Sequence, residues 1–286
     1  MGRLYVTIDT EMDADIHWKK GNPVCFSSVL EGIPKLYRPI WDRNDVNPIY
    51  FVSPEIVEND DCCEILREEI EKGAIIGAHL HPEYIEPERV SINEIETEKF
   101  PCFGYEYEIE KEKIRNLVQL IEEKLDVKVE WYRAARFGAD QDTISILSEL
   151  GLKYDSSFTP NIDWSSKGGP DHSKVQLDSY ILDNKEIVEY PVTITGKRFG
   201  IIGRFLPDNW LFYKWLRPSH MTYMEQKSLI RYLKKNDIKN AVMMFHSMEV
   251  MVRKTPYVRN KFMQKYFLWR LEKTIKYAKQ NGFFAD

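Results

Sequence analysis

Strand-like and helix-like segments alternate along most of this chain, and this alternation restricts its fold more than any other feature. Several short segments are rich in apolar, β-branched and aromatic residues, as strands are: 3–9, 48–54, 74–81, 127–133, 152–157 and 241–247. Helical patterns separate many of them, over about 29–42, 114–125, 140–150 and 222–236. Repeated β-α units predict a mainly parallel sheet or barrel, so the expected class is α/β.

The length and composition fit one ordinary globular domain. No linker or repeat divides the 286 residues, so we expect a single domain over 1–286. Two long stretches, 82–107 and 156–220, interrupt the rhythm, and loops of that length are usually functional. The 45 acidic and 40 basic residues give a net charge of -5, which argues against a nucleic-acid partner.

Cysteine usage and the chain's first residues bear on its location. The four cysteines form no C-x-x-C pair and are too sparse for a disulfide framework, which favours a reducing compartment. The opening MGRLYVTIDTE lacks the pattern of a signal peptide, and no run of 18 apolar residues occurs. We therefore expect no membrane span and a cytoplasmic protein.

Polar residues follow one predicted strand after another. They are Asp9, Glu11, His79, His81, Arg133, Arg136, Asp155 and His246. The carboxyl ends of parallel strands share one edge of the sheet, and ligands bind at that edge. A single residue of this kind is more often a cap or a turn residue. Because so many share one topological position, we expect a site there.

The segment GAHLHPE, residues 77–83, suggests what such a site would hold. Side chains alternate along a strand, so His79 and His81 should point to the same face. Two cations there would repel each other, whereas two imidazole lone pairs aimed at a divalent metal ion are stable. The pair therefore predicts a metal site with at least one further ligand.

Five short motifs, in order, resemble those of NodB-type polysaccharide deacetylases, which form carbohydrate esterase family four. They are TIDTE (7–11), IGAHLHPE (76–83), YRAARFG (132–138), YDSS (154–157) and MMFHS (243–247). The closest resemblance is to a branch associated with lipopolysaccharide biosynthesis, often called WalW-like. It implies a distorted (β/α) barrel with a divalent metal ion at its mouth, and an enzyme that removes an N-acetyl or other N-acyl group from an amino sugar.

The same resemblance implies a role for each matching residue. Asp9 takes the position of the catalytic base, Arg133 that of the arginine that orients it, and His246 that of the catalytic acid, oriented by Asp155. The metal ligands would be Glu11, His79 and His81. Mixed nitrogen and oxygen ligands suit zinc, and iron, cobalt or nickel could bind the same set.

Two motifs depart from the family's usual pattern. Thr10 replaces the second of two adjacent aspartates, so Glu11 becomes the candidate ligand, and either Asp9 or Glu11 could be the base. The two histidines are separated by one residue instead of three, so one or both could bind the metal. Two other classes stay open: an amidohydrolase, which also uses H-x-H, and a non-catalytic glycan-binding or scaffold protein on a degraded barrel.

The substrate expected from these features is an amino sugar on a cytosolic precursor, either nucleotide-linked or lipid-linked. Trp164, Trp210 and Trp215, in the long 156–220 stretch, are candidates for recognising it. Residues 207–220 have the spacing of an amphipathic helix, and residues 259–280 that of a solvated helix packed over the barrel. The mildly negative net charge offers no polybasic membrane anchor, which favours a soluble substrate or a membrane partner.

Overall fold

The expected alternation of strands and helices is present in the computed structural model, which describes residues 1–21, 23–90, 104–182, 186–198, 205 and 212–285. Nine strands form the main sheet: β1 (Gly2–Thr10), β2 (Ile49–Val52), β3 (Ile75–Leu80), β4 (Trp131–Ala134), β5 (Tyr154–Asp155), β6 (Tyr180–Ile181), β7 (Val188–Glu189), β10 (Asn240–His246) and β11 (Phe283–Phe284). The predicted α/β class is therefore confirmed.

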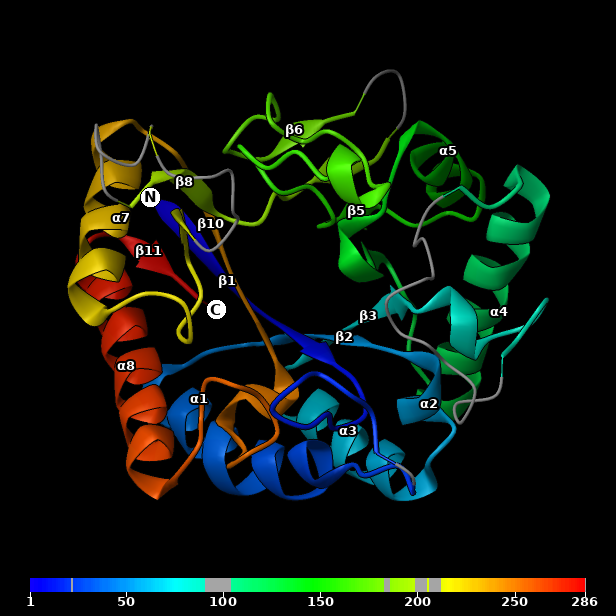
Figure 1. Ribbon diagram of the computed structural model, residues 1–286, viewed down its shortest axis with the longest axis horizontal. Coiled ribbons are helices and arrows are strands. Elements are labelled where there is room, and N and C mark those ends of the chain that lie inside the picture. The colour runs from blue at the N-terminus through cyan, green and yellow to red at the C-terminus, as the bar shows by residue number, and fades with distance from the viewer. Residues whose placement is uncertain (22, 91–103, 183–185, 199–204, 206–211, 286) are drawn as a thin grey trace.

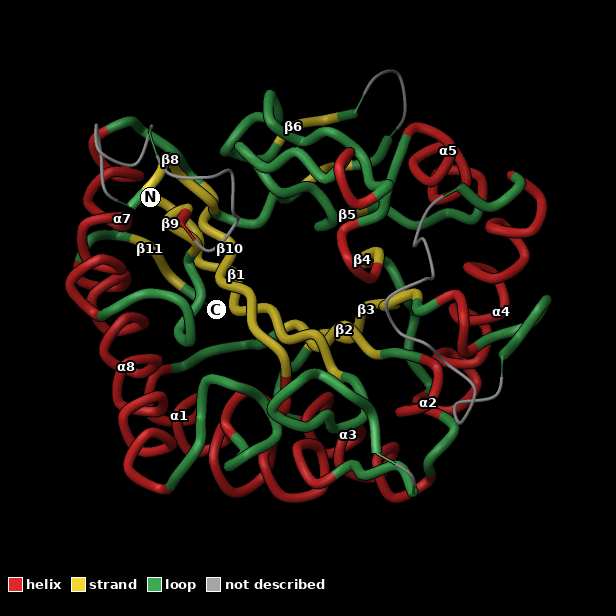
Figure 2. Tube along the Cα trace, viewed as in Figure 1, coloured by secondary structure: helices red, strands yellow, loops and turns green. Residues whose placement is uncertain are grey.

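The sheet is parallel apart from one pair and curls into an open half-barrel. Its spatial order is β10-β1-β2-β3-β4-β5-β7-β6, with β11 beside β1, and only β6 and β7 run antiparallel. In Figure 2 the yellow strands curve around the centre of the molecule while most of the red helices lie outside them. Parallel register brings every carboxyl end of the core strands to the same rim.

Helices cover the outer face of the curled sheet (Figure 1). The longer ones are η1 (Ser28–Tyr37), α1 (Arg38–Asn44), α3 (Asp60–Glu71), α4 (Tyr107–Leu125), α5 (Gln141–Glu149), α7 (Tyr223–Lys235) and α8 (Lys261–Gln280). Short turns are α2 (Pro54–Val57), η2 (Pro82–Tyr84), η4 (Ala135–Phe137), η5 (Ser165–Lys167) and η7 (Ser247–Val250). The starts of α5 and α7 are fixed by capping boxes at Asp140 and Thr222.

Alternation along β1 shows how the sequence divides the two faces of the sheet. Leu4, Val6 and Ile8 are buried in the main core, together with apolar residues of η1, α1, α3 and α4. Tyr5 points the other way and packs with Phe51 and Trp131 in a separate cluster inside the curl. Asp9 shares the inward parity of Tyr5, so the strand that builds the core also directs a carboxylate into the barrel.

The two long connecting stretches hold more regular structure than expected. Residues 82–90 and 104–107 contain η2 and the start of α4, and residues 91–103 lie outside the described residues. The 156–220 stretch contributes β6 and β7 to the sheet and forms a separate antiparallel pair, β8 (Ile194–Lys197) with β9 (Tyr213–Trp215). The predicted helix over 207–220 is therefore wrong at 213–215. Trp210 lies outside the described residues.

Most other boundaries agree with the sequence to within a few residues. The helix predicted over about 29–42 occupies η1 and α1, those over 140–150 and 222–236 are α5 and α7, and α4 begins seven residues before the predicted 114. Within the described ranges, none of the helices combines the length and apolar character needed to cross a membrane. The assignment of the whole chain to one domain stays a prediction.

Candidate functional site

Glu11, His79 and His81 come together, buried, at the carboxyl rim of the sheet. Glu11 directly follows β1, His79 lies in β3, and His81 directly follows β3. The Nε2 atoms of both histidines lie 3.3 Å from the same carboxylate oxygen, Glu11 Oε1. One nitrogen or oxygen atom from each of the three residues lies within 4.8 Å of the other two. The shared parity expected of the two histidines thus produces a convergent set of donors.

Neighbouring groups fix the orientation of both imidazole rings. Nδ1 of His79 donates to the backbone carbonyl of Arg133 at 2.9 Å, which keeps the lone pair on Nε2. Nδ1 of His81 lies 3.3 Å from the carboxylate of Glu83, which in turn accepts a 2.6 Å hydrogen bond from Arg136. A metal-binding histidine usually donates its other ring nitrogen in this way.

Electrostatics keep the carboxylate of Glu11 ionised. Its second oxygen accepts from the ammonium of Lys20 at 2.9 Å, so the first oxygen remains directed at the histidines. Burial would raise the pKa of Glu11, but Lys20 and His81 together hold it well below its usual range. Burial would likewise lower the pKa of His81, but the carboxylates of Glu11 and Glu83 raise it to about 9. The cluster therefore strongly attracts positive charge.

The residues present fit a divalent metal ion. Nε2 of His81 is fully buried yet has no hydrogen-bond partner, although it faces the Glu11 carboxylate. When His81 is deprotonated, this nitrogen is a buried acceptor beside a carboxylate, an arrangement that is costly unless a cation lies between them. Two imidazole nitrogens and one carboxylate oxygen form the three-ligand set that catalytic zinc sites use, with a further position left open.

Asp9 and Arg133 form a second buried unit beside the cluster. The guanidinium donates to Asp9 at 2.7 Å and to the Thr7 hydroxyl at 3.0 Å, while Ser156 accepts from its other nitrogens. Burial raises the pKa of Asp9, but Arg133, and more weakly His79 and His246, bring it below the ordinary value. Asp9 is thus held as a carboxylate within electrostatic reach of His79 and His246.

His246 borders the cluster from the other side. It ends β10 directly opposite Asp9 in the register of β1, and its Nε2 lies 3.6 Å from Glu11 Oε1. Its Nδ1 lies 3.0 Å from the carboxylate of Glu249, which also accepts the backbone N–H of His246 at 3.0 Å. Glu249 is paired with Arg217, and both are buried. A guanidinium nitrogen of Arg217 also lies 2.9 Å from Nδ1, so Glu249 and Arg217 together hold this side of the ring and Nε2 is left facing the site.

Asp155 does not occupy the position expected of it. It pairs in register with Tyr132, one residue before Arg133, so alternation directs its side chain away from the inward face that carries Arg133. Its carboxylate accepts from Ser157 at 2.6 Å and interacts with Glu189 instead of His246. Burial raises the pKa of both carboxyls, that of Glu189 well above its ordinary value. The carboxylate at Nδ1 of His246 is that of Glu249.

Four residues of the site were not identified from the sequence: Lys20, Glu83, Arg217 and Glu249. Two of them carried a local signal, because Glu83 follows His81 by two residues and Glu249 follows His246 by three. Lys20 and Arg217 carried none, since both lie in irregular segments whose direction the sequence pattern does not define. Arg136, one of the polar residues expected at this rim, is the partner of Glu83.

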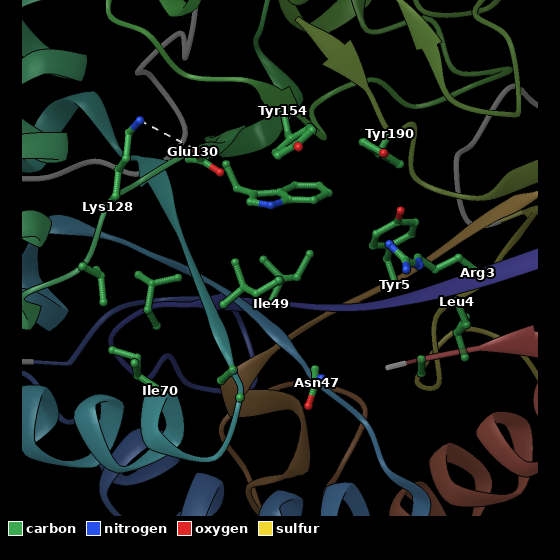
Figure 3. Close-up of a pocket in the computed structure, with 17 residues that line it drawn as sticks. Arg3, Leu4, Tyr5, Asn47, Ile49, Ile70, Lys128, Glu130, Tyr154 and Tyr190 are labelled. Atoms are coloured by element: carbon green, nitrogen blue, oxygen red, sulfur yellow. Dashed lines mark ion pairs between the residues drawn. The ribbon is translucent and has the colours of Figure 1, made fainter.

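A hollow lies at the opposite end of the barrel (Figure 3). It has a volume of about 570 Å³ and is lined by residues at the amino ends of the strands, including Tyr5, Ile49, Trp131 and Tyr154. None of the predicted catalytic or metal-binding residues lines it. Its aromatic rings pack against one another, with centroids 4.6 Å apart for Trp131 and Tyr154, so they form the floor of the barrel.

Comparisons with known proteins show the fold at low sequence identity. A candidate polysaccharide deacetylase from Mycobacterium smegmatis is 16% identical with a TM-score of 0.56, over 100% of this chain and 88% of that protein. A family 57 glycoside hydrolase branching enzyme from Thermococcus kodakaraensis is 13% identical with a TM-score of 0.54, over 99% and 69%. A family 4 carbohydrate esterase pseudoenzyme from Bacillus anthracis is 11% identical with a TM-score of 0.48, over 99% and 62%.

No family model and no curated protein matches the chain at the level of sequence. The structural likeness shows that the curled sheet is the distorted barrel of NodB-type deacetylases, as the motifs predicted. The same barrel also occurs in an enzyme named for branching, so a function has to be argued from the residues at the rim.

Proposed function

We propose that this protein is a metal-dependent hydrolase that removes an N-acetyl or other N-acyl group from an amino sugar. The observation that carries the proposal is the buried Glu11, His79 and His81 set on a deacetylase-type barrel, with Asp9 on one side and His246 on the other. A divalent ion bound there, for which zinc is the best match, would supply Lewis-acid polarisation of the amide carbonyl.

The chain's own residues would handle the protons of amide hydrolysis. Asp9, held ionised by Arg133, would take a proton from the water that attacks the carbonyl carbon. His246 would give a proton from Nε2 to the amide nitrogen as the C–N bond breaks, releasing a free amine and a carboxylate. Glu249 would hold the imidazole through Nδ1 during this exchange.

Two carboxylates alone could also suggest glycosidic chemistry, as the fold of the branching enzyme allows. Glycoside hydrolases place two carboxyl groups on either side of the scissile bond. Here Asp9 and Glu11 lie two residues apart on one strand end, and each is held by its own cation. The histidine-rich rim therefore supports amide hydrolysis better.

For the substrate, we propose an acylated amino sugar on a cytosolic nucleotide-linked or lipid-linked precursor of a surface polysaccharide or lipopolysaccharide. Trp215, expected to help recognise the substrate, is only 2% exposed and packs against Phe137, so its ring is not available to a sugar. The tryptophan that adjoins the site is Trp18, whose ring centroid lies 5.3 Å from that of His246. Its half-buried indole is the surface on which we expect a sugar ring to stack.

The test measures metal content and acyl release together. Metal-loaded protein would be incubated with nucleotide-linked and lipid-linked N-acyl sugars, and the released acid quantified. His79→Ala should lose both bound metal and activity, while Lys235→Glu, an exposed change on α7, should lose neither. Wild-type metal content in His79→Ala would show that the metal site is wrong. A protein that binds metal but releases no acid from any such substrate would fit the scaffold alternative.

A further inference from the structure

Large apolar side chains are exposed on one end of the α7–α8 helix pair. Phe262, Met263, Tyr266 and Trp269 of α8 form this surface, called here the docking face, and Met224 is exposed on the neighbouring α7. Phe262 is 79% exposed and Met224 is 64% exposed. Among the residues that the structure describes, these five are nearly half of the eleven most exposed large apolar side chains. Such a concentration is unusual on a surface that only meets water.

The docking face occupies the first half of α8. Along α8, Phe262, Tyr266 and Trp269 share one side, opposite the buried side that includes Phe267 and Leu271. Farther along the helix, exposed positions hold Lys273 and Lys276 instead. Ring contacts link the two helices, since the Tyr223 and Trp269 centroids lie 5.4 Å apart.

This end of the helix pair is the end that carries the candidate site. α7 leads into β10, and α8 leads into β11, which pairs with the start of β1. α8 therefore runs from the carboxyl rim of the sheet toward the amino side, and the first turns of α7 lie beside its middle, where Thr274 donates to Gln226 (Figure 1). The connection from His246 to α8 also carries Tyr257, whose ring lies 5.8 Å from that of Trp18 at the site. The docking face thus lies beside the mouth.

Positive charge is concentrated in the part of the chain that carries the docking face. Residues 222–286 hold 14 of the chain's 40 basic residues but only 5 of its 45 acidic residues, so the acidic total hides a basic C-terminal part. Lys261 and Lys265 are exposed among the aromatic residues, and the Arg270 guanidinium lies 4.9 Å from the Tyr266 ring centroid. Aromatic residues interleaved with lysine and arginine are typical of proteins that bind at an anionic membrane surface.

We propose that the docking face binds the headgroup region of an anionic lipid bilayer, with the mouth of the barrel beside the membrane. A second copy of the chain fits less well, because a two-fold contact would bring Lys261 and Lys265 of one copy against those of the other. The inference is independent of the proposed deacetylation, since none of its residues belongs to the candidate site. It does place a lipid-linked substrate within reach.

Co-sedimentation of the full chain with vesicles tests the proposal. Vesicles of phosphatidylcholine alone would be compared with vesicles that also contain phosphatidylglycerol, at low and high salt. We expect binding to the anionic vesicles only, weakened by salt. Phe262→Ser combined with Trp269→Ser should reduce binding by about tenfold or more, and Lys261→Glu combined with Lys265→Glu by a similar factor.

Matched controls change equally exposed residues elsewhere. Ile181→Ser, at a residue 71% exposed on β6, and Lys235→Glu, at the far end of α7, should leave vesicle binding unchanged. His79→Ala should also bind normally, which separates this test from that of the enzyme activity. Equal binding to both vesicle types, no binding, or binding unaffected by the docking-face changes would overturn the proposal. So would concentration-dependent dimerisation that the same changes abolish, because it would assign the surface to a second copy.

Discussion

The variant Glu249→Gln tests whether the carboxylate of Glu249, instead of that of Asp155, orients the imidazole of His246. The Glu249 carboxylate accepts from the His246 backbone, lies 3.0 Å from its Nδ1, and pairs with the buried Arg217. Replacing it by an amide leaves the ring without its charged acceptor. If Glu249 orients the general acid, turnover should fall by a factor of about 10² to 10⁴ while metal content stays unchanged.

The same change should also destabilise the fold, and the two effects can be separated. Arg217 is 4% exposed, so losing its partner leaves a buried charge, which typically costs about 3–5 kcal/mol. Adding Arg217→Met removes that charge and should restore most of the free energy of unfolding. Turnover should remain low in the double variant, because His246 then lacks both the Glu249 carboxylate and its 2.9 Å contact with Arg217. Urea unfolding and acid release, measured on the same preparations, distinguish the two contributions.

Asp155→Asn is the matched control. Its carboxyl contacts Ser157 and Glu189, so the amide should leave turnover within about tenfold of the original. Burial raises the pKa of both Asp155 and Glu189, so the contribution of this pair to the free energy of unfolding is lost as the pH rises. Asp155→Asn removes one of the two carboxyls and should make the free energy of unfolding fall less steeply with pH. A hundredfold loss of turnover in Asp155→Asn, with Glu249→Gln near normal, would refute the assignment.

Three further changes test other parts of the structure. Glu83→Gln, which removes the carboxylate behind His81, should weaken metal affinity about 10- to 100-fold in a chelator competition. Burial raises the pKa of Glu110 from 4.5 to about 7, so the contribution of its protonated carboxyl to stability is lost as the pH rises through that range. In urea unfolding, Glu110→Gln should therefore stabilise the protein by about 2–3 kcal/mol at pH 8 but not at pH 4. Gly77→Ala would place a Cβ 2.7 Å from the Phe51 ring, so thermal unfolding should show a loss of about 1–3 kcal/mol.

Local patterns in the sequence predicted the scaffold and the convergence of His79 and His81, whereas Glu11 was a candidate ligand only through the family resemblance. Strand parity alone placed His79 and His81 on one face, and parallel topology brought them to the end of β1 where Glu11 lies. These inferences needed only periodicity and the rule that parallel strands share a rim. The two histidines are found together because strand parity and the end at which a strand stops can both be read from a single segment.

Partners set by long-range packing could not be predicted in this way. The side that Asp155 faces depends on its register with β4, and a shift of one residue reverses it. Arg217 reaches Glu249 from a loop between β9 and α7. Residues 213–215 had helical spacing, yet pairing with β8 made them a strand, so tertiary contact outweighed local preference.

The pairing of the buried charges bears on which carboxylate of the first motif, Asp9 or Glu11, acts as the base. Asp9 is paired with Arg133, Glu83 with Arg136 and Glu249 with Arg217, whereas Lys20 holds only the outer oxygen of Glu11. The inner oxygen of Glu11 therefore faces the two imidazoles without a cation of its own from Lys or Arg. That position is the one that suits a metal ligand.

Glu11→Gln and Asp9→Asn should therefore fail in different ways. An amide at position 11 supplies a neutral oxygen beside the two histidines, so metal affinity should fall by at least about tenfold, and activity with it. An amide at position 9 leaves the three ligands in place, so metal content should be retained while turnover falls by a factor of about 10² to 10⁴. Elemental analysis beside acid release measures both. Retained metal in Glu11→Gln together with lost metal in Asp9→Asn would exchange the two roles, because it would show that Asp9 holds the ion and that Glu11 is the carboxylate left to accept the proton.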